Sequence, residues 1–178
     1  FRFGMPGPPL EDAEWRRCLD EVEGLDPAPD YLVASGSLPP EVPEDFYARL
    51  ARMCAAKRIR LVVDTSGDAL RLSLEEGLFL IKPNLRELRA IAGEDLEEES
   101  RQERLVRSLI EEGRCRHVVV SLGAAGVLAA SRNNFRRLRA PTVRIQSKVG
   151  AGDSTVAGIV LGLSRGRPFM DAVRYGMA

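Results

Sequence analysis

The sequence has 178 residues, of which 44% are hydrophobic and 29% are charged. This composition supplies enough apolar material for the core of a soluble globular domain and argues against a disordered chain or a membrane protein. The 26 basic and 26 acidic residues cancel, so no bulk positive charge is present to hold nucleic acid. Any phosphate site must therefore be built locally.

Predicted helices and strands alternate along the chain. After a turn at residues 6–9, helical spacing or strand-like runs predict, in order, a helix at 10–22, a strand at 31–34, a helix at 43–57, a strand at 60–64, a helix at 68–76, a strand at 78–82, helices at 84–92 and 100–112, and a strand at 117–121. Antiparallel edge strands follow at 127–130, 135–138 and 143–145, then a helix at 151–163 and another from 168 onward. This alternation predicts an α/β three-layer sandwich on a mostly parallel sheet. The strand at 31–34 is expected to be buried and that at 117–121 to be central, with ligands beyond the carboxyl ends of the strands.

The cysteines and the two ends of the chain indicate its compartment and its extent. Cys18, Cys54 and Cys115 are widely spaced and form no CxxC pair, which predicts reduced thiols. The first residues lack the apolar core of a signal peptide, so we expect a cytoplasmic protein. Because the chain begins without Met and stops inside a helical pattern, we expect one α/β domain, residues 1–178, that is incomplete at both ends.

The most informative motif is Gly150-Ala151-Gly152-Asp153, directly before a predicted apolar helix. Small residues let the backbone approach a ligand, and the amides of a first helical turn attract anions. Two interpretations of Asp153 remain open. It can be the base that takes a proton from a hydroxyl in phosphoryl transfer, while the amides of Ala151 and Gly152 stabilise the transferring group. It can also merely cap the helix or complement its dipole.

A second motif, Lys82-Pro83-Asn84-Leu85-Arg86-Glu87, ends one strand and begins a helix. Asn84 and Glu87 lie three residues apart, so their side chains face the same way. They suit Mg²⁺, bound directly or through water, and they equally suit a capping box; both interpretations can hold together. Lys82 either reaches nucleotide phosphate or simply ends the strand.

Three further loops follow predicted strands. The glycines of the segment Ser121-Leu122-Gly123-Ala124-Ala125-Gly126 let backbone amides face phosphate oxygens, although a plain tight turn suits them equally well. Ser35-Gly36-Ser37 and Asp64-Thr65-Ser66-Gly67 follow the first two strands. We expect the Asp64 loop to line a cleft rather than to take part in chemistry.

These motifs, in this order, resemble those of the ribokinase-like carbohydrate kinases, and the similarity runs essentially from end to end of the chain. The resemblance implies an ATP-dependent, magnesium-dependent phosphotransferase in which Asp153 of Gly150-Ala151-Gly152-Asp153 deprotonates the sugar hydroxyl. It implies that the nucleotide is contacted by Lys82, Asn84, Ser121, Gly123 and Gly126. The metal would be held by Asn84 and Glu87, and the sugar by Gly36 and Ser37.

Within that family, residues 1–7, 35–40 and 146–154 look most like the bacterial 6-phosphofructokinase branch. This resemblance implies phosphorylation of fructose 6-phosphate to fructose 1,6-bisphosphate in glycolysis. Relatives that act on fructose 1-phosphate or tagatose 6-phosphate share the scaffold and stay as alternatives. The resemblance also implies a homodimer in the full-length protein, with small-molecule substrates and with no nucleic-acid or membrane partner.

Three departures from the family pattern bear on activity. We expect the family's amino-terminal lid part and its carboxy-terminal, adenine-holding helices to be missing, and the 178 residues alone to be inactive. Lys148 stands where the family usually has Thr, where it can contact phosphate or fill the site of a monovalent cation. Separately, Arg2 can bind a sugar phosphate, although a plain surface arginine is the simpler explanation.

Two other functions compete with the kinase. A nucleotide-binding module without turnover is the alternative from a different functional class. A dinucleotide-binding oxidoreductase is disfavoured, because no Gly-Xaa-Gly-Xaa-Xaa-Gly follows a first strand.

Overall fold

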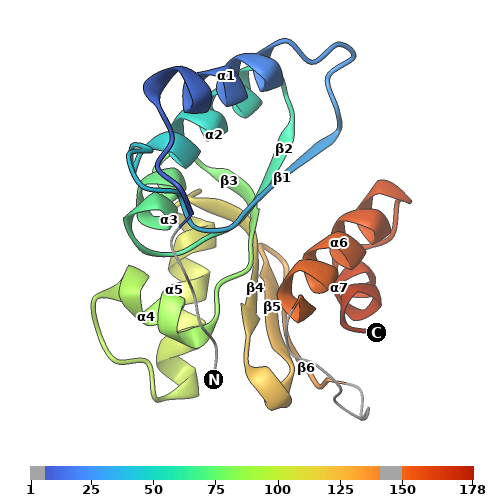
Figure 1. Ribbon diagram of the computed structural model, residues 1–178. Coiled ribbons are helices and arrows are strands. Elements are labelled where there is room, and N and C mark those ends of the chain that lie inside the picture. The colour runs from blue at the N-terminus through green and yellow to red at the C-terminus, as the bar shows by residue number, and fades with distance from the viewer. Residues whose placement is uncertain (1–6, 141–149) are drawn as a thin grey trace.

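The computed structural model describes residues 7–140 and 150–178. Six strands form one sheet in the order β1-β2-β3-β4-β5-β6 (Figure 1). Strands β1 to β4 are parallel, whereas β5 and β6 are antiparallel to their neighbours. Their bounds are β1 Tyr31–Ser35, β2 Arg60–Asp64, β3 Leu78–Ile81, β4 Cys115–Ser121, β5 Val127–Ser131 and β6 Asn134–Leu138. The strand predicted at residues 143–145 lies outside the described residues.

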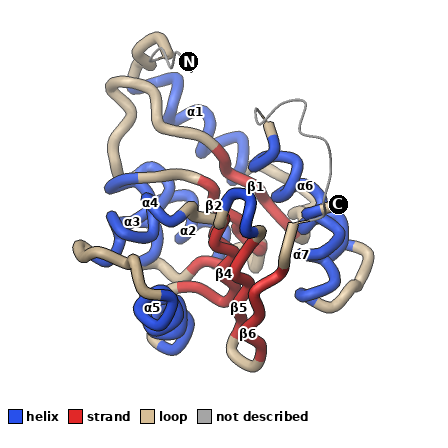
Figure 2. Tube along the Cα trace, turned by 90° about the horizontal axis from the view of Figure 1, so that it is seen from below, coloured by secondary structure: helices blue, strands red, loops and turns tan. Residues whose placement is uncertain are grey.

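Helices cover both faces of the sheet, so the predicted α/β sandwich is confirmed (Figure 2). One face carries α1 Asp12–Glu23, α2 Phe46–Ala56, α3 Gly67–Leu74, α4 Leu85–Ala92 and α5 Glu99–Glu111. The other face carries α6 Ala151–Ser164 and α7 Phe169–Met177. Within residues 7–140 and 150–178, no helix has the length and apolarity needed to cross a membrane.

The β-branched runs of the central strands fill two separate cores. Val63, Val118 and Val120 pack on the side of α2 to α5, whereas Val62 and Val119 pack on the side of α6 and α7. All five are completely buried. Successive side chains of a strand point to opposite faces, so a strand covered on both sides needs apolar residues at consecutive positions.

Two strands differ from the prediction in their place in the sheet. The apolar run at residues 31–34 predicted a buried strand, but β1 lies at the edge of the described sheet and its Val33 is 43% exposed. Conversely, β5 was predicted as an edge strand but lies between β4 and β6, and its first four residues are buried. Composition reports how apolar a strand is, whereas its place in the sheet depends on partners that are distant in sequence.

The contact between α6 and α7 brings two backbones together. A Cβ added at Gly158 of α6 would lie 2.6 Å from the Cα of Gly176 in α7. A Cβ added at Gly176 would lie 2.5 Å from the carbonyl oxygen of Thr155 and 2.8 Å from Cγ1 of Ile159. Only glycine leaves room for this approach, so the small residues of the predicted helix are explained by its packing against α7.

The three cysteines are free, as predicted. Cys18 is exposed, whereas Cys54 and Cys115 are buried. Burial raises the pKa of the Cys54 thiol to about 11 and that of Cys115 to about 12. Both buried thiols therefore stay protonated at neutral pH and behave as small apolar side chains.

His117, the single histidine of the sequence, lies on β4 between two aromatic rings. Its ring centroid is 4.9 Å from that of Phe79 and 4.2 Å from that of Phe169. Its Nδ1 is buried without a hydrogen-bond partner among the described residues. Burial, with a smaller contribution from the charge of Arg116, lowers the pKa of His117 to about 4.

The lowered pKa predicts a pH-dependent stability. Protonation of His117 favours the unfolded chain, so its stabilising contribution is complete above the unfolded pKa of 6.5 and is lost as the pH falls towards 4. We expect this residue to lower the free energy of unfolding by about 3 kcal/mol between pH 7 and pH 4. Urea unfolding of the wild type and of His117→Phe, which keeps a ring in the stack, measures the effect. A difference between the two proteins that does not change with pH would contradict it.

Candidate active site

The candidate active site lies at the edge of the sheet where β1 to β4 end. These neighbouring strands are parallel, so their carboxyl ends meet. Ser35, Asp64 and Ser121 are the last residues of β1, β2 and β4, and Lys82 follows β3 directly. The first turn of α6 reaches the same edge. Motifs that are far apart in the sequence are therefore neighbours in space.

Asp153 lies in the first turn of α6, which begins after Gly150. Its Oδ1 accepts a hydrogen bond at 3.2 Å from Oγ of Ser35, a residue 118 positions away in the sequence. Both side chains belong to exposed residues. Asp153 thus lies in the first turn of α6, as predicted, and also contacts the end of β1. An accessible carboxylate in this place can accept a proton from a bound hydroxyl.

A buried ion pair lies beside the α6 turn. Nζ of Lys82 is 3.1 Å from Oδ2 of Asp64, and the two side chains are 9% and 15% exposed. A Cβ added at Gly152 would lie 3.3 Å from the same Nζ. Lys82 thus lies next to the first turn of α6, and its contact with nucleotide phosphate stays a prediction. The amides of this turn attract an anion, whereas the charge of Lys82 is balanced by that of Asp64.

Gly36 is held by three hydrogen bonds. Its carbonyl accepts from the hydroxyls of Tyr47 and Thr65, both at 2.8 Å, and its N–H donates to the carbonyl of Asp64 at 3.0 Å. Burial and, to a smaller extent, the charge of Asp64 raise the pKa of Tyr47 against a lowering effect of Thr65, so the phenol remains a donor. Ser37 follows as an exposed residue. The predicted sugar contacts thus stand on a fixed backbone.

The capping box predicted at the start of α4 is present. The N–H of Asn84 donates to Oε2 of Glu87, and the N–H of Glu87 donates to Oδ1 of Asn84, each at 2.9 Å. In the described ranges no group of three or more His, Cys, Asp or Glu side chains is arranged to hold a metal ion. The capping role accounts for one oxygen of each side chain, and the predicted magnesium role would have to share these residues with it.

The predicted phosphate loop is tied to the Lys82–Glu87 motif. The N–H of Ser121 donates to the carbonyl of Pro83 at 2.8 Å. Gly123–Ala125 form a short 3-10 turn, closed by a hydrogen bond of 2.9 Å from the N–H of Leu122 to the carbonyl of Gly126. The loop is therefore a tight turn, which was one of its two interpretations. It also lies at the edge of the sheet where the other interpretation, a phosphate loop, requires it to be.

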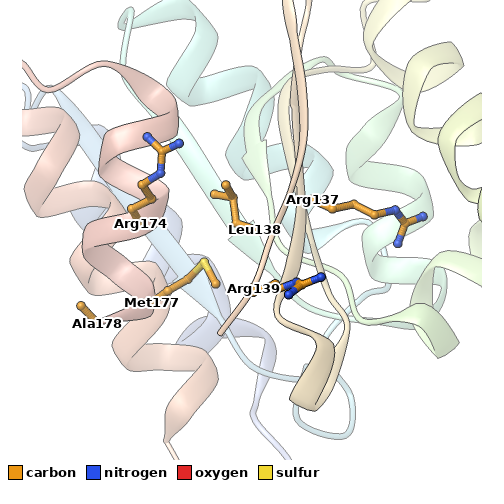
Figure 3. Close-up of a pocket in the computed structure, with 6 residues that line it drawn as sticks. All are labelled: Arg137, Leu138, Arg139, Arg174, Met177 and Ala178. Atoms are coloured by element: carbon orange, nitrogen blue, oxygen red, sulfur yellow. The ribbon is translucent and has the colours of Figure 1, made fainter. Parts of the chain in front are cut away.

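A cavity of about 350 Å³ opens between β6 and α7. Leu138 pairs with Val127, so this cavity lies at the same edge as the turn at Gly126. In Figure 3 Met177 and Leu138 face each other across it, whereas Arg137 extends to the other side of the strands, where it pairs with Glu99 and Glu103. The lining residues are Arg137, Leu138, Arg139, Arg174, Met177 and Ala178.

Several residues of the site were not singled out from the sequence. Ser35 ends β1 and Thr65 follows β2 directly, and this place at a strand end was the signal that could have identified them. Tyr47 lies on α2, where no local pattern points to the sheet edge. Lys148, whose two possible roles were left open, and Arg2, explained more simply as a surface arginine, lie outside the described residues.

Comparisons with known proteins show the family to which the chain belongs. The model of the pfkB family of carbohydrate kinases matches residues 6–178. ATP-dependent 6-phosphofructokinase isozyme 2 of Mycobacterium tuberculosis H37Rv is 44% identical over 178 residues, which cover 100% of this chain and 52% of that protein. The 1-phosphofructokinase of Bacillus subtilis 168 is 33% identical over 171 residues, which cover 96% and 56%. The chain thus spans about half the length of these curated relatives.

Solved structures give the same result. Phosphofructokinase-2 from Escherichia coli in complex with fructose-6-phosphate matches 99% of this chain and 58% of its own, with a TM-score of 0.88 and 35% identity. Ribokinase of Arabidopsis thaliana, complexed with ribose and ATP, matches 97% of this chain and 52% of its own with a TM-score of 0.72. At 17% identity the ribokinase shows the fold alone, and the predicted ribokinase-like architecture is confirmed. The chain belongs to the pfkB family of carbohydrate kinases.

Proposed function

We propose that the gene product containing these residues transfers the γ-phosphoryl group of ATP to a sugar phosphate, with fructose 6-phosphate as acceptor and fructose 1,6-bisphosphate as product. The observation that carries the proposal is the accessible carboxylate of Asp153 at the start of α6, next to the Lys82–Asp64 ion pair. The 44% identity to a 6-phosphofructokinase supports the acceptor.

In the proposed reaction Asp153 takes the proton of the acceptor hydroxyl while that oxygen attacks the γ-phosphorus. The bond from this phosphorus to the bridging oxygen breaks, and ADP leaves with the electron pair. The amides of Ala151 and Gly152 donate hydrogen bonds to the phosphoryl oxygens, and Lys82 adds positive charge. Fixed donors and cations of this kind stabilise charge that develops in the transition state.

The two substrates would approach from opposite sides of Asp153. Gly36 and Ser37 would hold the sugar phosphate, because β1 ends directly against the α6 turn. Ser121, Gly123 and Gly126 would hold the nucleotide phosphates. The cavity between β6 and α7 adjoins the turn at Gly126, and the apolar side chains of Leu138 and Met177 that line it would contact the adenine ring of the nucleotide.

Asn84 and Glu87 would hold Mg²⁺, largely through water, since each side chain already contributes an oxygen to the capping box. When bound, the ion neutralises charge on the nucleotide phosphates. The capping box fixes both side chains at the edge where the phosphates would lie. A monovalent cation near the α6 turn is part of the same proposal.

The proposal is tested by measuring ADP release from ATP and Mg²⁺ with fructose 6-phosphate, fructose 1-phosphate and tagatose 6-phosphate in parallel. We expect the highest kcat/KM with fructose 6-phosphate. A higher value with either of the others would identify that sugar as the acceptor. ATP binding by calorimetry without turnover on any acceptor would replace the kinase by a nucleotide-binding module, and the absence of both would contradict either function.

A further inference from the structure

We infer that Ser35 is a positioning residue for Asp153: its hydroxyl holds one carboxylate oxygen, so that the other faces the acceptor hydroxyl. The inference rests on the proposed function, because it concerns the base of that reaction. It begins from the 3.2 Å hydrogen bond between Ser35 Oγ and Asp153 Oδ1. Within residues 7–140 and 150–178, this is the one hydrogen bond that joins β1 to α6.

The backbone that carries the hydroxyl is fixed on both sides. Ser35 is the last residue of β1 and stands opposite Asp64 in the parallel ladder with β2. The next residue, Gly36, is held by the hydroxyls of Tyr47 and Thr65 and by the carbonyl of Asp64. A short side chain on so constrained a backbone has few positions available, and serine has one rotatable bond before its oxygen. The donor is therefore placed by the sheet.

The carboxylate that accepts this bond needs such a support. Asp153 is exposed at the beginning of a helix, so its side chain has room to rotate. A general base acts only when its oxygen lies within hydrogen-bond reach of the proton it removes. A hydrogen bond to Oδ1 selects one orientation and leaves Oδ2 directed away from Ser35. Ser35 thus acts on the chemical step through Asp153, without touching the substrate in this role.

Kinetics of Ser35→Ala in the gene product that contains this chain test the inference. We expect kcat to fall by about tenfold, in line with the loss of one hydrogen bond to a charged group. The KM values for ATP and sugar phosphate should stay unchanged. Ser35→Thr keeps the hydroxyl and should retain kcat, and Ser35→Cys, a weaker donor, should fall between the two. Ser164→Ala, at the far end of α6 where the hydroxyl bonds the carbonyl of Leu161, is the matched control and should leave kcat unchanged.

A double mutant separates positioning from an independent effect. In the Asp153→Asn background, Ser35→Ala should cause no further loss, since Ser35 acts through the carboxylate. An equal tenfold loss in that background, an unchanged kcat in Ser35→Ala, or a raised KM with unchanged kcat would each overturn the inference while the proposed function stands. A wild type that is inactive on every acceptor would overturn the proposed function itself, and the inference with it.

Discussion

Replacing Asp153 by Asn is expected to lower the kcat of phosphoryl transfer by about 10²- to 10⁴-fold, the usual contribution of a general base. The amide has nearly the shape of the carboxylate and its oxygen can still accept the hydrogen bond from Ser35, but it cannot take the proton of the acceptor. Steady-state ADP release measures kcat, and thermal unfolding verifies that the variant is folded.

Asp171→Asn is the matched control for this substitution. Asp171 lies in the first turn of α7, as Asp153 does in α6, and pairs with Arg174 at the surface. If the carboxylate of Asp153 served only the helix dipole, the two variants would lose similar, small amounts of stability and both would keep their activity. A kcat for Asp153→Asn within about threefold of the wild type would remove Asp153 from the role of base.

Replacing Gly126 by Ala is expected to lower the free energy of unfolding by about 3 kcal/mol or more. Gly126 has a φ of 96° and a ψ of −129°, a conformation that an L-residue with a side chain rarely adopts. The added Cβ would also overlap the carbonyl oxygen of Leu138 and lie 2.7 Å from the nitrogen of Ala140. Because both contacts are backbone atoms, the strand end and the turn would have to separate.

Gly123→Ala supplies the comparison within the same turn. Gly123 also has a positive φ, 62°, but nothing lies within 4 Å of an added Cβ. The free energy of unfolding of this variant should fall by only about 1 kcal/mol, which is the cost of placing alanine in a left-handed backbone conformation. Urea unfolding of both variants measures the difference. Equal losses would show that the close approach of β6 to the turn does not constrain Gly126.

Much of the fold could be predicted because local patterns and tertiary structure agree. The β-branched run before Ser121 predicts a central strand, and β4 is buried on both faces of the sheet. The places of β1 and β5 in the sheet were predicted wrongly from the same kind of evidence. Which strand lies at an edge depends on pairing between distant segments, and hydropathy within a run of five residues does not report pairing.

The candidate site was predictable to the level of its loops but not of its contacts. The rule that ligands bind beyond the carboxyl ends of parallel strands places Lys82, Gly36 and Asp153 at one edge. The bond from Ser35 to Asp153 could not be predicted, since 118 residues separate two exposed polar side chains. The support that Tyr47 gives to Gly36, 11 residues earlier, could not be predicted either, because the apolar spacing of its helix explains only the packing of that helix in the core.

The glycine contact between α6 and α7 links the position of Asp153, the proposed base, to the neighbouring helix. The backbone of Gly176 lies close to that of Thr155, two residues after Asp153, since a Cβ added at Gly176 would lie 2.5 Å from the carbonyl oxygen of Thr155. Helix α7 thus packs against the beginning of α6. A displacement of about 1 Å at a reacting group can cost roughly a hundredfold in rate. Helix α7 carries none of the proposed catalytic residues, yet it packs against the helix that carries Asp153.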